Sequence, residues 1–351
     1  MSYIGKPKVA HPNLPRNELN LTVRDYEGGM STLCAGCGHD SITGAITQAI
    51  FELSIPPHRL AKLSGIGCSS KTPAYFASAS HGFNTVHGRM PSVVSGANAA
   101  NKDLHYIGVS GDGDSLSIGL GQFMHAVRRN LNMLYIIENN GVYGLTKGQF
   151  SATADAGSKS KRGIVNHDSP IDMVSLALQL GASYVGRSFS GDKTQLTPLI
   201  KGAILHCGAA FIDVISPCVA FNNHPGSTKS FDYVREHNEA VNRLDVILGR
   251  TPITTDYEPG TVTEVTQHDG SRLKLRKLAA EYDASDRNHA MAYLQERQSA
   301  GEIVTGLLYV DPESQDLHDH LHTAPTPLNR LGDAELTPGS AALDAINAAL
   351  R

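Results

Sequence analysis

The sequence has little that would place the protein in a membrane or outside the cell. None of its apolar runs approaches the roughly 18 consecutive residues that span a bilayer. Residues 1–13 are polar and include Pro7 and Pro12, so we expect no secretory signal there. Only five cysteines occur among 351 residues. We therefore expect a cytoplasmic protein whose thiols are reduced and serve metal or redox chemistry, not a disulfide framework.

An excess of basic residues is also lacking. Lys and Arg total 30 against 34 for Asp and Glu, which gives a formal net charge of −4. We therefore expect no nucleic-acid partner. Apolar residues make up 40% of the chain and charged residues 18%, which excludes extensive disorder and allows a substantial core. The length suits two compact domains, or one domain with a long appendage.

Strand and helix patterns alternate between residues 31 and 230. Helices are expected at 41–53, 116–129, 171–180 and 194–206. Strands are expected at 60–65, 104–110, 133–137, 183–185 and 210–215. This alternation predicts an α/β fold with a mainly parallel sheet and helices on both of its faces.

The two ends of the chain differ from this central part. Residues 1–30 are predicted to form an N-terminal arm, and residues 231–351 a C-terminal extension. The extension is expected to contain a helix near 233–248, polar connections, a short apolar segment at 303–310 and an extended tail.

A first chemical motif joins the ends of two expected strands. Gly-Asp-Gly-Asp at 111–114 follows one strand, and Glu-Asn-Asn at 138–140 follows the next. A helix-sized segment separates the strands, so a right-handed crossover would make them parallel and bring both ends to one edge of the sheet. Ligands of open α/β sheets bind at that edge. Two unrelated turns are the alternative.

The residue types in this motif suit a hard cation that is bound together with an anion. Asp112 offers a carboxylate oxygen, Asn140 an amide oxygen and the backbone at Gly141-Val142 a carbonyl, which are the ligands that Mg²⁺ prefers. Gly111 and Gly113 allow main-chain N–H groups to approach an anion closely. The pattern predicts a magnesium–diphosphate site and resembles the thiamine-diphosphate motif.

Four of the cysteines follow or precede expected strands and helices. Cys34 and Cys37 form a Cys-x-x-Cys loop, Cys68 lies in a Gly-rich turn, and Cys218 follows a strand. Four thiolates of this kind could hold a [4Fe–4S] cluster or a structural zinc ion, or could be a dithiol with two bystanders. We expect Cys207 to be a small buried apolar residue.

Three alternating histidines in the tail form a second possible metal motif. They are His318, His320 and His322, in an acidic segment flanked by prolines. We expect this segment to be solvated and not to bind a metal.

Taken together, the motifs resemble the β subunits of 2-oxoacid:ferredoxin oxidoreductases, most closely the 2-oxoglutarate (2-oxoglutarate synthase) type. The resemblance rests on the segments 34–39, 65–71, 87–89, 111–114, 138–149 and 216–218. It implies the diphosphate-binding half of the thiamine-diphosphate-binding fold, followed by a C-terminal extension. The implied cofactors are thiamine diphosphate, Mg²⁺ and a [4Fe–4S] cluster, with CoA as co-substrate.

The resemblance also implies roles for individual residues. The cluster ligands would be Cys34, Cys37, Cys68 and Cys218, and the Mg²⁺ ligands Asp112, Asn140 and Val142. The cofactor contacts would be Gly38, His39, Gly67, Ser69, Ser70, His87, Gly88, Gly111, Asp112, Gly113, Asp114, Asn140, Val142, Gly144, Leu145 and Thr146. The catalytic residues would be His39, Lys71 and Arg89.

The implied reaction is the CoA-dependent oxidative decarboxylation of 2-oxoglutarate to succinyl-CoA and CO₂, with electrons passing to ferredoxin, and its reductive reverse. An α subunit would supply the carboxylate that activates the aminopyrimidine, in an αβ or (αβ)₂ assembly. Lys147 would bind the distal carboxylate of the substrate, although a solvated lysine or one that holds a CoA phosphate is also consistent with the sequence. Three alternatives remain: pyruvate or another 2-oxoacid as substrate, a non-oxidative split decarboxylase, and a zinc-stabilised interaction subunit.

Overall fold

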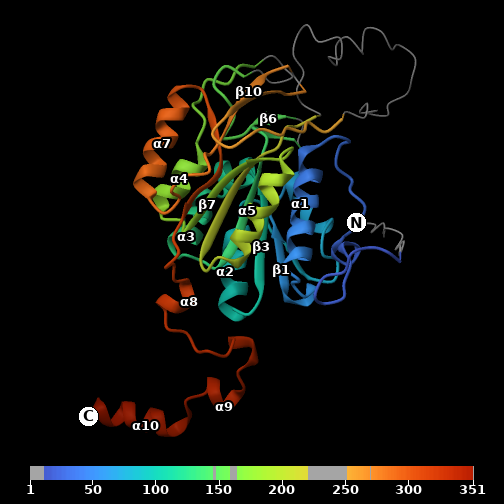
Figure 1. Ribbon diagram of the computed structural model, residues 1–351. Coiled ribbons are helices and arrows are strands. Elements are labelled where there is room, and N and C mark those ends of the chain that lie inside the picture. The colour runs from blue at the N-terminus through green and yellow to red at the C-terminus, as the bar shows by residue number, and fades with distance from the viewer. Residues whose placement is uncertain (1–11, 145–147, 159–163, 220–250, 269, 351) are drawn as a thin grey trace.

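The computed structural model describes residues 12–144, 148–158, 164–219, 251–268 and 270–350 (Figure 1). Within these residues, nine strands form one sheet in the order β2-β1-β3-β4-β8-β7-β11-β10-β9. The strands are β1 (Leu60–Ser64), β2 (His81–Asn84), β3 (His105–Gly111), β4 (Met133–Asn139), β7 (Tyr184–Phe189), β8 (Ala209–Ile215), β9 (Val262–Thr266), β10 (Arg272–Lys277) and β11 (Ile303–Val310). A separate two-stranded sheet pairs β5 (Val142–Tyr143) with β6 (Gln149–Phe150).

The sheet is parallel from β2 to β7 and mixed beyond it. β11 runs antiparallel to β7 and parallel to β10, and β9 runs antiparallel to β10. The central strands are apolar almost throughout because both of their faces are covered; all five residues of β1 are buried. The predicted α/β fold with a mainly parallel sheet is confirmed.

Helices cover both faces of the sheet, as predicted. Helices α1 (Gly38–Glu52) and α5 (Lys193–Leu205) pack on one face, where Ile42, Ile46 and Leu196 join the core. Helices α2 (Met90–Ala100), α3 (Leu120–Arg128), α4 (Met173–Leu180) and α7 (Arg287–Ser299) cover the opposite face. Two cores therefore lie on either side of one sheet.

Shorter helices connect these elements or extend the C-terminal end. They are η1 (Val23–Tyr26), η2 (Pro57–Arg59), η3 (Ser69–Ala74), η4 (Gly113–Ile118), η5 (Leu328–Arg330), α8 (Leu317–His320) and α9 (Asp333–Leu336). Helix α10 (Gly339–Ala349) stands apart from the sheet at the end of the chain (Figure 1). Among the described helices, none combines the length and the apolar character needed to cross a membrane.

The C-terminal extension contributes more structure than the sequence patterns indicate. β9, β10 and α7 lie where we expected polar connections, and β11 joins the sheet beside β7. The structure also contains β2 and α2, which no pattern predicted. The expected helix near 233–248 lies outside the described residues, and the division at residues 30 and 230 stays a prediction.

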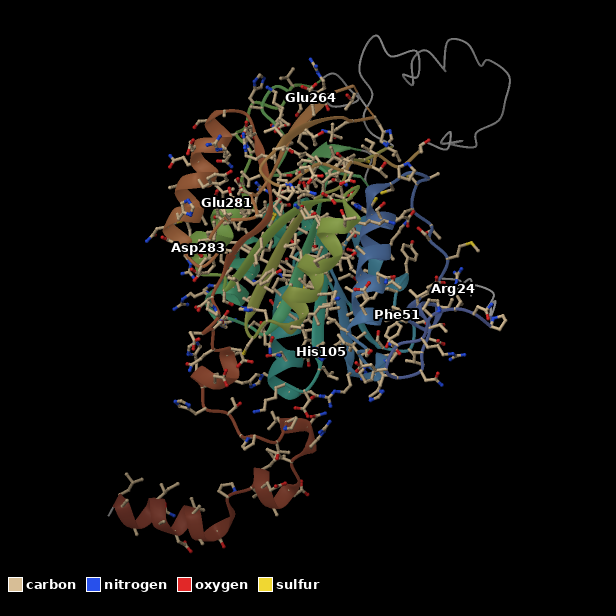
Figure 2. All side chains as sticks on the ribbon, viewed as in Figure 1. Arg24, Phe51, His105, Glu264, Glu281 and Asp283 are labelled. Atoms are coloured by element: carbon tan, nitrogen blue, oxygen red, sulfur yellow. The ribbon has the colours of Figure 1, made fainter. Side chains whose placement is uncertain are left out.

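Two smaller expectations are wrong. Cys207 is exposed, because it follows the end of α5 at the surface. His318 is buried instead of solvated, and its Nε2 lies 3.1 Å from the side-chain oxygen of Asn98. These residues lie at the end of the sheet where β3 begins, which His105 marks in Figure 2.

Candidate functional site

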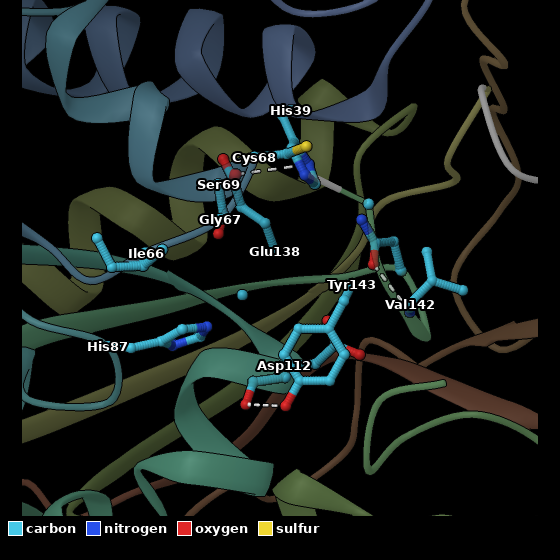
Figure 3. Close-up of a pocket in the computed structure, with 14 residues that line it drawn as sticks. His39, Ile66, Gly67, Cys68, Ser69, His87, Asp112, Glu138, Val142 and Tyr143 are labelled. Carbon is cyan, nitrogen blue, oxygen red and sulfur yellow. Dashed lines mark hydrogen bonds and ion pairs between the residues drawn. The ribbon is translucent and has the colours of Figure 1, made fainter. Parts of the chain in front are cut away.

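A pocket lies where β1, β3 and β4 end. These three strands are adjacent and parallel, so their carboxyl ends meet at one edge of the sheet. The pocket is lined by His39, Ile66, Gly67, Cys68, Ser69, His87, Gly111, Asp112, Gly113, Glu138, Asn140, Val142, Tyr143 and Gly144 (Figure 3). Five segments that are far apart in the sequence thus contribute to one cavity.

Asp112 is the buried carboxyl group at the end of β3. It is 1% exposed, and its Oδ2 accepts hydrogen bonds from the Gly141 N–H at 3.1 Å and from the hydroxyls of Ser151 and Thr153. Burial raises the pKa of Asp112, although the two hydroxyls act in the opposite direction. Among the residues that the structure describes, no lysine or arginine pairs with Asp112, so its site suits a metal ion that would supply positive charge.

The other expected magnesium ligands lie in the turn after β4. Asn140 and Val142 line the same cavity as Asp112. The Asn140 side-chain oxygen accepts a hydrogen bond from the Val142 N–H at 3.1 Å, which holds the turn closed. Gly141, between them, has φ +72°, a conformation that glycine adopts without strain.

Gly113 marks the place where an anion would approach the main chain. A Cβ atom at this position would lie 2.5 Å from the ring of Tyr143, so only glycine fits. The Tyr143 hydroxyl donates a hydrogen bond to the Gly113 carbonyl at 3.1 Å. Tyr143 thus closes one wall of the pocket, a role that follows from its place in the 138–149 motif but that our sequence reasoning did not assign.

Asp114 does not line the pocket, although the sequence suggested a diphosphate contact. Its Oδ1 accepts hydrogen bonds from His87 Nδ1, from the Gly88 N–H at 2.8 Å and from the Ile66 N–H at 3.2 Å. Its Oδ2 accepts one from the Ser110 hydroxyl at 2.6 Å. The Asp114 side chain therefore joins three loops and orients His87 toward the pocket, and the diphosphate contact that the resemblance implies for Asp114 stays a prediction.

A second buried group connects the pocket to the cysteine loops. Glu138 is fully buried and accepts hydrogen bonds from the Thr72 hydroxyl at 2.9 and 3.0 Å. His39 Nδ1 lies 3.5 Å from Glu138 and 2.6 Å from the Ser216 hydroxyl oxygen. Burial raises the pKa of Glu138 well above its usual range and lowers the pKa of His39 to about 4, so both groups favour their neutral forms.

The four expected cluster cysteines come from three loops on this side of the sheet. Cys37 precedes α1, Cys68 precedes η3 and Cys218 follows β8. Burial raises the pKa of the Cys68 thiol to about 11, and Cys218 and Cys34 raise it further by their nearby negative charge. Cys218 acts on Cys37 in the same way. The thiols are therefore close enough to affect one another electrostatically.

Several residues that the resemblance named lie around the pocket but do not line it. Gly38 packs against Ser216, and Gly88 packs against Gly119. Lys71 lies near Cys68 and lowers the pKa of its thiol, while Arg89 is exposed at the start of α2. Leu145, Thr146 and Lys147 lie outside the described residues.

Ser70 provides one more observation on the chemistry of this region. Its hydroxyl oxygen is buried and has no hydrogen-bond partner in the described part of the chain. A buried polar group without a partner costs free energy, which a bound group could recover.

Sequence comparisons give the same family as the motifs. Residues 65–214 match the family described as thiamine pyrophosphate enzyme, C-terminal TPP binding domain. The chain is 44% identical over 191 residues to the 2-oxoacid:ferredoxin oxidoreductase subunit beta of Saccharolobus solfataricus, which covers 54% of this chain and 63% of that protein. It is 40% identical over 206 residues to the 2-oxoglutarate oxidoreductase subunit KorB of Mycobacterium tuberculosis, covering 58% and 53%. The matches thus span less than two thirds of these relatives' own lengths.

A solved structure extends the similarity over most of the chain. The structure described as 2-oxoglutarate:ferredoxin oxidoreductase from Magnetococcus marinus with 2-oxoglutarate, coenzyme A and succinyl-CoA bound has a TM-score of 0.68 and 30% identity. The match covers 86% of this chain and 89% of that one. The chain therefore belongs to the β subunits of the 2-oxoacid:ferredoxin oxidoreductases, and its pocket lies in the thiamine-diphosphate-binding domain of that family.

Proposed function

We propose that this chain is the subunit of a 2-oxoglutarate:ferredoxin oxidoreductase that binds the diphosphate of thiamine diphosphate and a [4Fe–4S] cluster. One observation carries the proposal: Cys68 and Asp112 line the same cavity. Chemistry at a bound cofactor would thus take place beside the cysteine loops. A non-oxidative decarboxylase would have no use for cysteines in this position.

Within the proposal, Asp112, Asn140 and the Val142 carbonyl hold Mg²⁺, and the main chain at Gly113 faces the diphosphate. When bound, thiamine diphosphate would supply an electron sink for the decarboxylation of a 2-oxoacid, and an iron–sulfur cluster would supply single-electron transfer. The chain's own residues exclude water and orient the cofactor. His87, which is held by Asp114, points a ring nitrogen into the pocket (Figure 3).

The proposed reaction favours an iron–sulfur cluster over zinc. Electrons leave for ferredoxin one at a time, and zinc has no redox chemistry with which to carry them, whereas an iron–sulfur cluster does. A zinc ion at these cysteines would therefore leave the reaction without its electron path.

The activity also needs groups from other chains. The described residues build one nine-stranded α/β sheet, at whose edge lies the diphosphate motif, so we assign the carboxylate that activates the aminopyrimidine to an α subunit, in an αβ or (αβ)₂ assembly. CoA and ferredoxin complete the reaction. The names of the Mycobacterium tuberculosis and Magnetococcus marinus relatives support 2-oxoglutarate as the substrate. Lys147 is our candidate for binding its distal carboxylate.

The test is anaerobic co-purification of the chain with its α subunit. We expect about four irons and matching acid-labile sulfide per β chain, and CoA-dependent reduction of a viologen dye with 2-oxoglutarate. Cys218→Ser should lose the iron, whereas Cys207→Ser, which removes the exposed fifth cysteine, should retain it. Zinc in place of iron, or no metal at all, would contradict the proposal.

Substrate choice needs a separate measurement. Lys147→Ala should raise the KM for 2-oxoglutarate roughly tenfold or more and change the KM for pyruvate little, because only the larger acid carries a second carboxylate. Equal effects on both acids would remove the role proposed for Lys147.

A further inference from the structure

A segment that no motif singled out crosses over the carboxyl group of Asp112. It follows β6, and its Ser151 and Thr153 hydroxyls both donate hydrogen bonds to Asp112 Oδ2. The segment is anchored on both sides: the Ser151 N–H donates to the Gly141 carbonyl at 3.1 Å, and the Ile171 N–H donates to the Ala152 carbonyl at 2.8 Å. Ser151 and Thr153 therefore approach Asp112 from a fixed backbone.

The hydrogen bonds are distributed unevenly between the two oxygens of Asp112. Oδ2 accepts from Ser151, from Thr153 and from the Gly141 N–H. Three donors saturate the acceptor capacity of one carboxylate oxygen and fix the plane of the carboxyl group. Oδ1 receives none of these three hydrogen bonds, which makes it the candidate oxygen for a cation. The main-chain N–H groups of Asp112 and Gly113 also hydrogen-bond to this carboxyl group.

Further hydrogen bonds fix the direction of the Thr153 hydroxyl. Arg187 Nε donates to Asp213 Oδ2 at 2.8 Å, and Asn139 Nδ2 donates to Asp213 Oδ1 at 3.1 Å. The Asn139 side-chain oxygen must then face Thr153 Oγ1, which lies 2.9 Å away. Thr153 Oγ1 thus lies within hydrogen-bond distance of three possible acceptors, Asp112 Oδ2, the Asn139 oxygen and, at 3.1 Å, Ser151 Oγ. A carboxylate that binds a cation is the strongest acceptor of the three, so the Thr153 hydrogen would go to Asp112 when the metal is bound.

We propose that Ser151 and Thr153 are positioning residues that hold Asp112 with Oδ1 turned toward the magnesium ion. Neither residue lines the pocket, so neither touches the cofactor. The inference rests on the proposed function, because it assumes that Asp112 binds a metal. Removing a group that orients a metal ligand in this way typically weakens metal binding 10- to 100-fold.

The experiment uses the complex with the α subunit and measures Mn²⁺ binding by electron paramagnetic resonance in the presence of thiamine diphosphate. Thr153→Val keeps the shape of the side chain and removes the hydroxyl, so we expect Mn²⁺ affinity to fall roughly 10- to 100-fold. Thr153→Ser restores the hydroxyl and should bind within roughly threefold of the unchanged complex. Ser151→Ala provides a second variant if Thr153→Val fails to fold, and we expect a similar loss.

A matched control lies in the same segment. Ser158 is half-buried and its hydroxyl donates to the Asp155 carbonyl at 2.6 Å, not to Asp112. Ser158→Ala should leave Mn²⁺ affinity unchanged. Unchanged affinity in folded Thr153→Val and Ser151→Ala complexes, with Asp112→Asn unable to bind, would overturn the positioning role. If the unchanged complex itself binds no Mn²⁺ with thiamine diphosphate, the proposed function fails, and this inference with it.

Discussion

Two sets of carboxyl groups in the sheet region differ in how their charge is balanced. Arg187 on β7 contacts both Asp213 on β8, at 2.8 Å, and Asp172 at the start of α4, at 2.7 Å. Asp112 and Glu138, at the ends of β3 and β4, are as buried as Asp213, whereas Asp172 is half-buried. In the part of the chain that the structure describes, neither of them forms an ion pair with a lysine or arginine.

The region around Arg187 contains its own positive charge, whereas the region around Asp112 and Glu138 does not in the described part of the chain. Burial pushes the pKa of Asp172 upward, but the charge of Arg187 and the hydrogen bonds outweigh it, so the pKa is lowered overall. Burial dominates at Asp213, Asp112 and Glu138, and the pKa values of all three are raised. What separates the two regions is therefore the ion pair: Asp213 contacts the guanidinium of Arg187. The second is suited to a cation supplied from outside the chain.

Removing the positive charge of Arg187 should have the largest effect on the stability of the fold. Arg187→Met leaves Asp172 and Asp213 buried without a positive partner, and we expect a loss of roughly 3–5 kcal/mol in the free energy of unfolding. Urea unfolding of the purified chain measures this loss. The double variant with Asp213→Asn should recover part of it. If Arg187→Met has the same unfolding midpoint as the unchanged chain, the carboxyl groups around Arg187 do not need its positive charge.

Removing the charge at the candidate site should affect binding and leave folding intact. Asp112→Asn keeps the side-chain shape, and we expect the affinity for Mg²⁺ with thiamine diphosphate to fall at least 100-fold, roughly 2.7 kcal/mol. The metal-free variant should unfold at the same temperature as the unchanged chain or higher, because it no longer buries an uncompensated carboxyl group. Calorimetric titration and thermal unfolding test both parts. A marked loss of stability would mean that Asp112 has a structural task.

The smallest expected effect is the loss of stability in Asp172→Asn, which should depend on pH. Asp172→Asn keeps the side-chain cap of α4 but loses the charge that pairs with Arg187, at a cost of roughly 1–3 kcal/mol near pH 7. The folded pKa of Asp172 lies below its unfolded value of about 3.9, so this contribution is complete above that pH and lost as pH falls through the folded pKa. The free energies of unfolding of Asp172→Asn and of the unchanged chain should therefore begin to converge below about pH 4. A constant difference down to pH 3 would contradict the assignment.

The central fold could be predicted from the sequence because buried parallel strands read as continuous apolar runs. The same runs placed Asp112 and Asn140 after consecutive strands, and the structure has β3 and β4 adjacent and parallel. The outer strands gave no such signal. β10 reads Arg-Leu-Lys-Leu-Arg-Lys with one fully buried residue, Leu275, because it lies near the edge of the sheet.

The parts of the candidate site that could not be predicted depend on contacts between distant segments. Ser151 and Thr153 are ordinary loop residues until the fold brings them to Asp112, about 40 positions earlier in the sequence. Asp114 and the 87–89 segment could both be recognised as motifs, but the hydrogen bonds of Asp114 to His87 and Gly88 depend on where the fold places that segment. Helix α7 escaped prediction because only Ala290 and Leu294 are buried in it.

The antiparallel pairing of β11 with β7 has a consequence for shortened forms of this protein. All six residues of β7 are buried, and β11 pairs with the side of β7 that faces away from β8. A chain ending near residue 219 would keep every motif in the pocket yet leave that strand without its neighbour. Unprotected apolar strand borders attract other copies of the same chain. Clipping by a protease after the diphosphate-binding domain should therefore produce aggregation before it abolishes the chemistry.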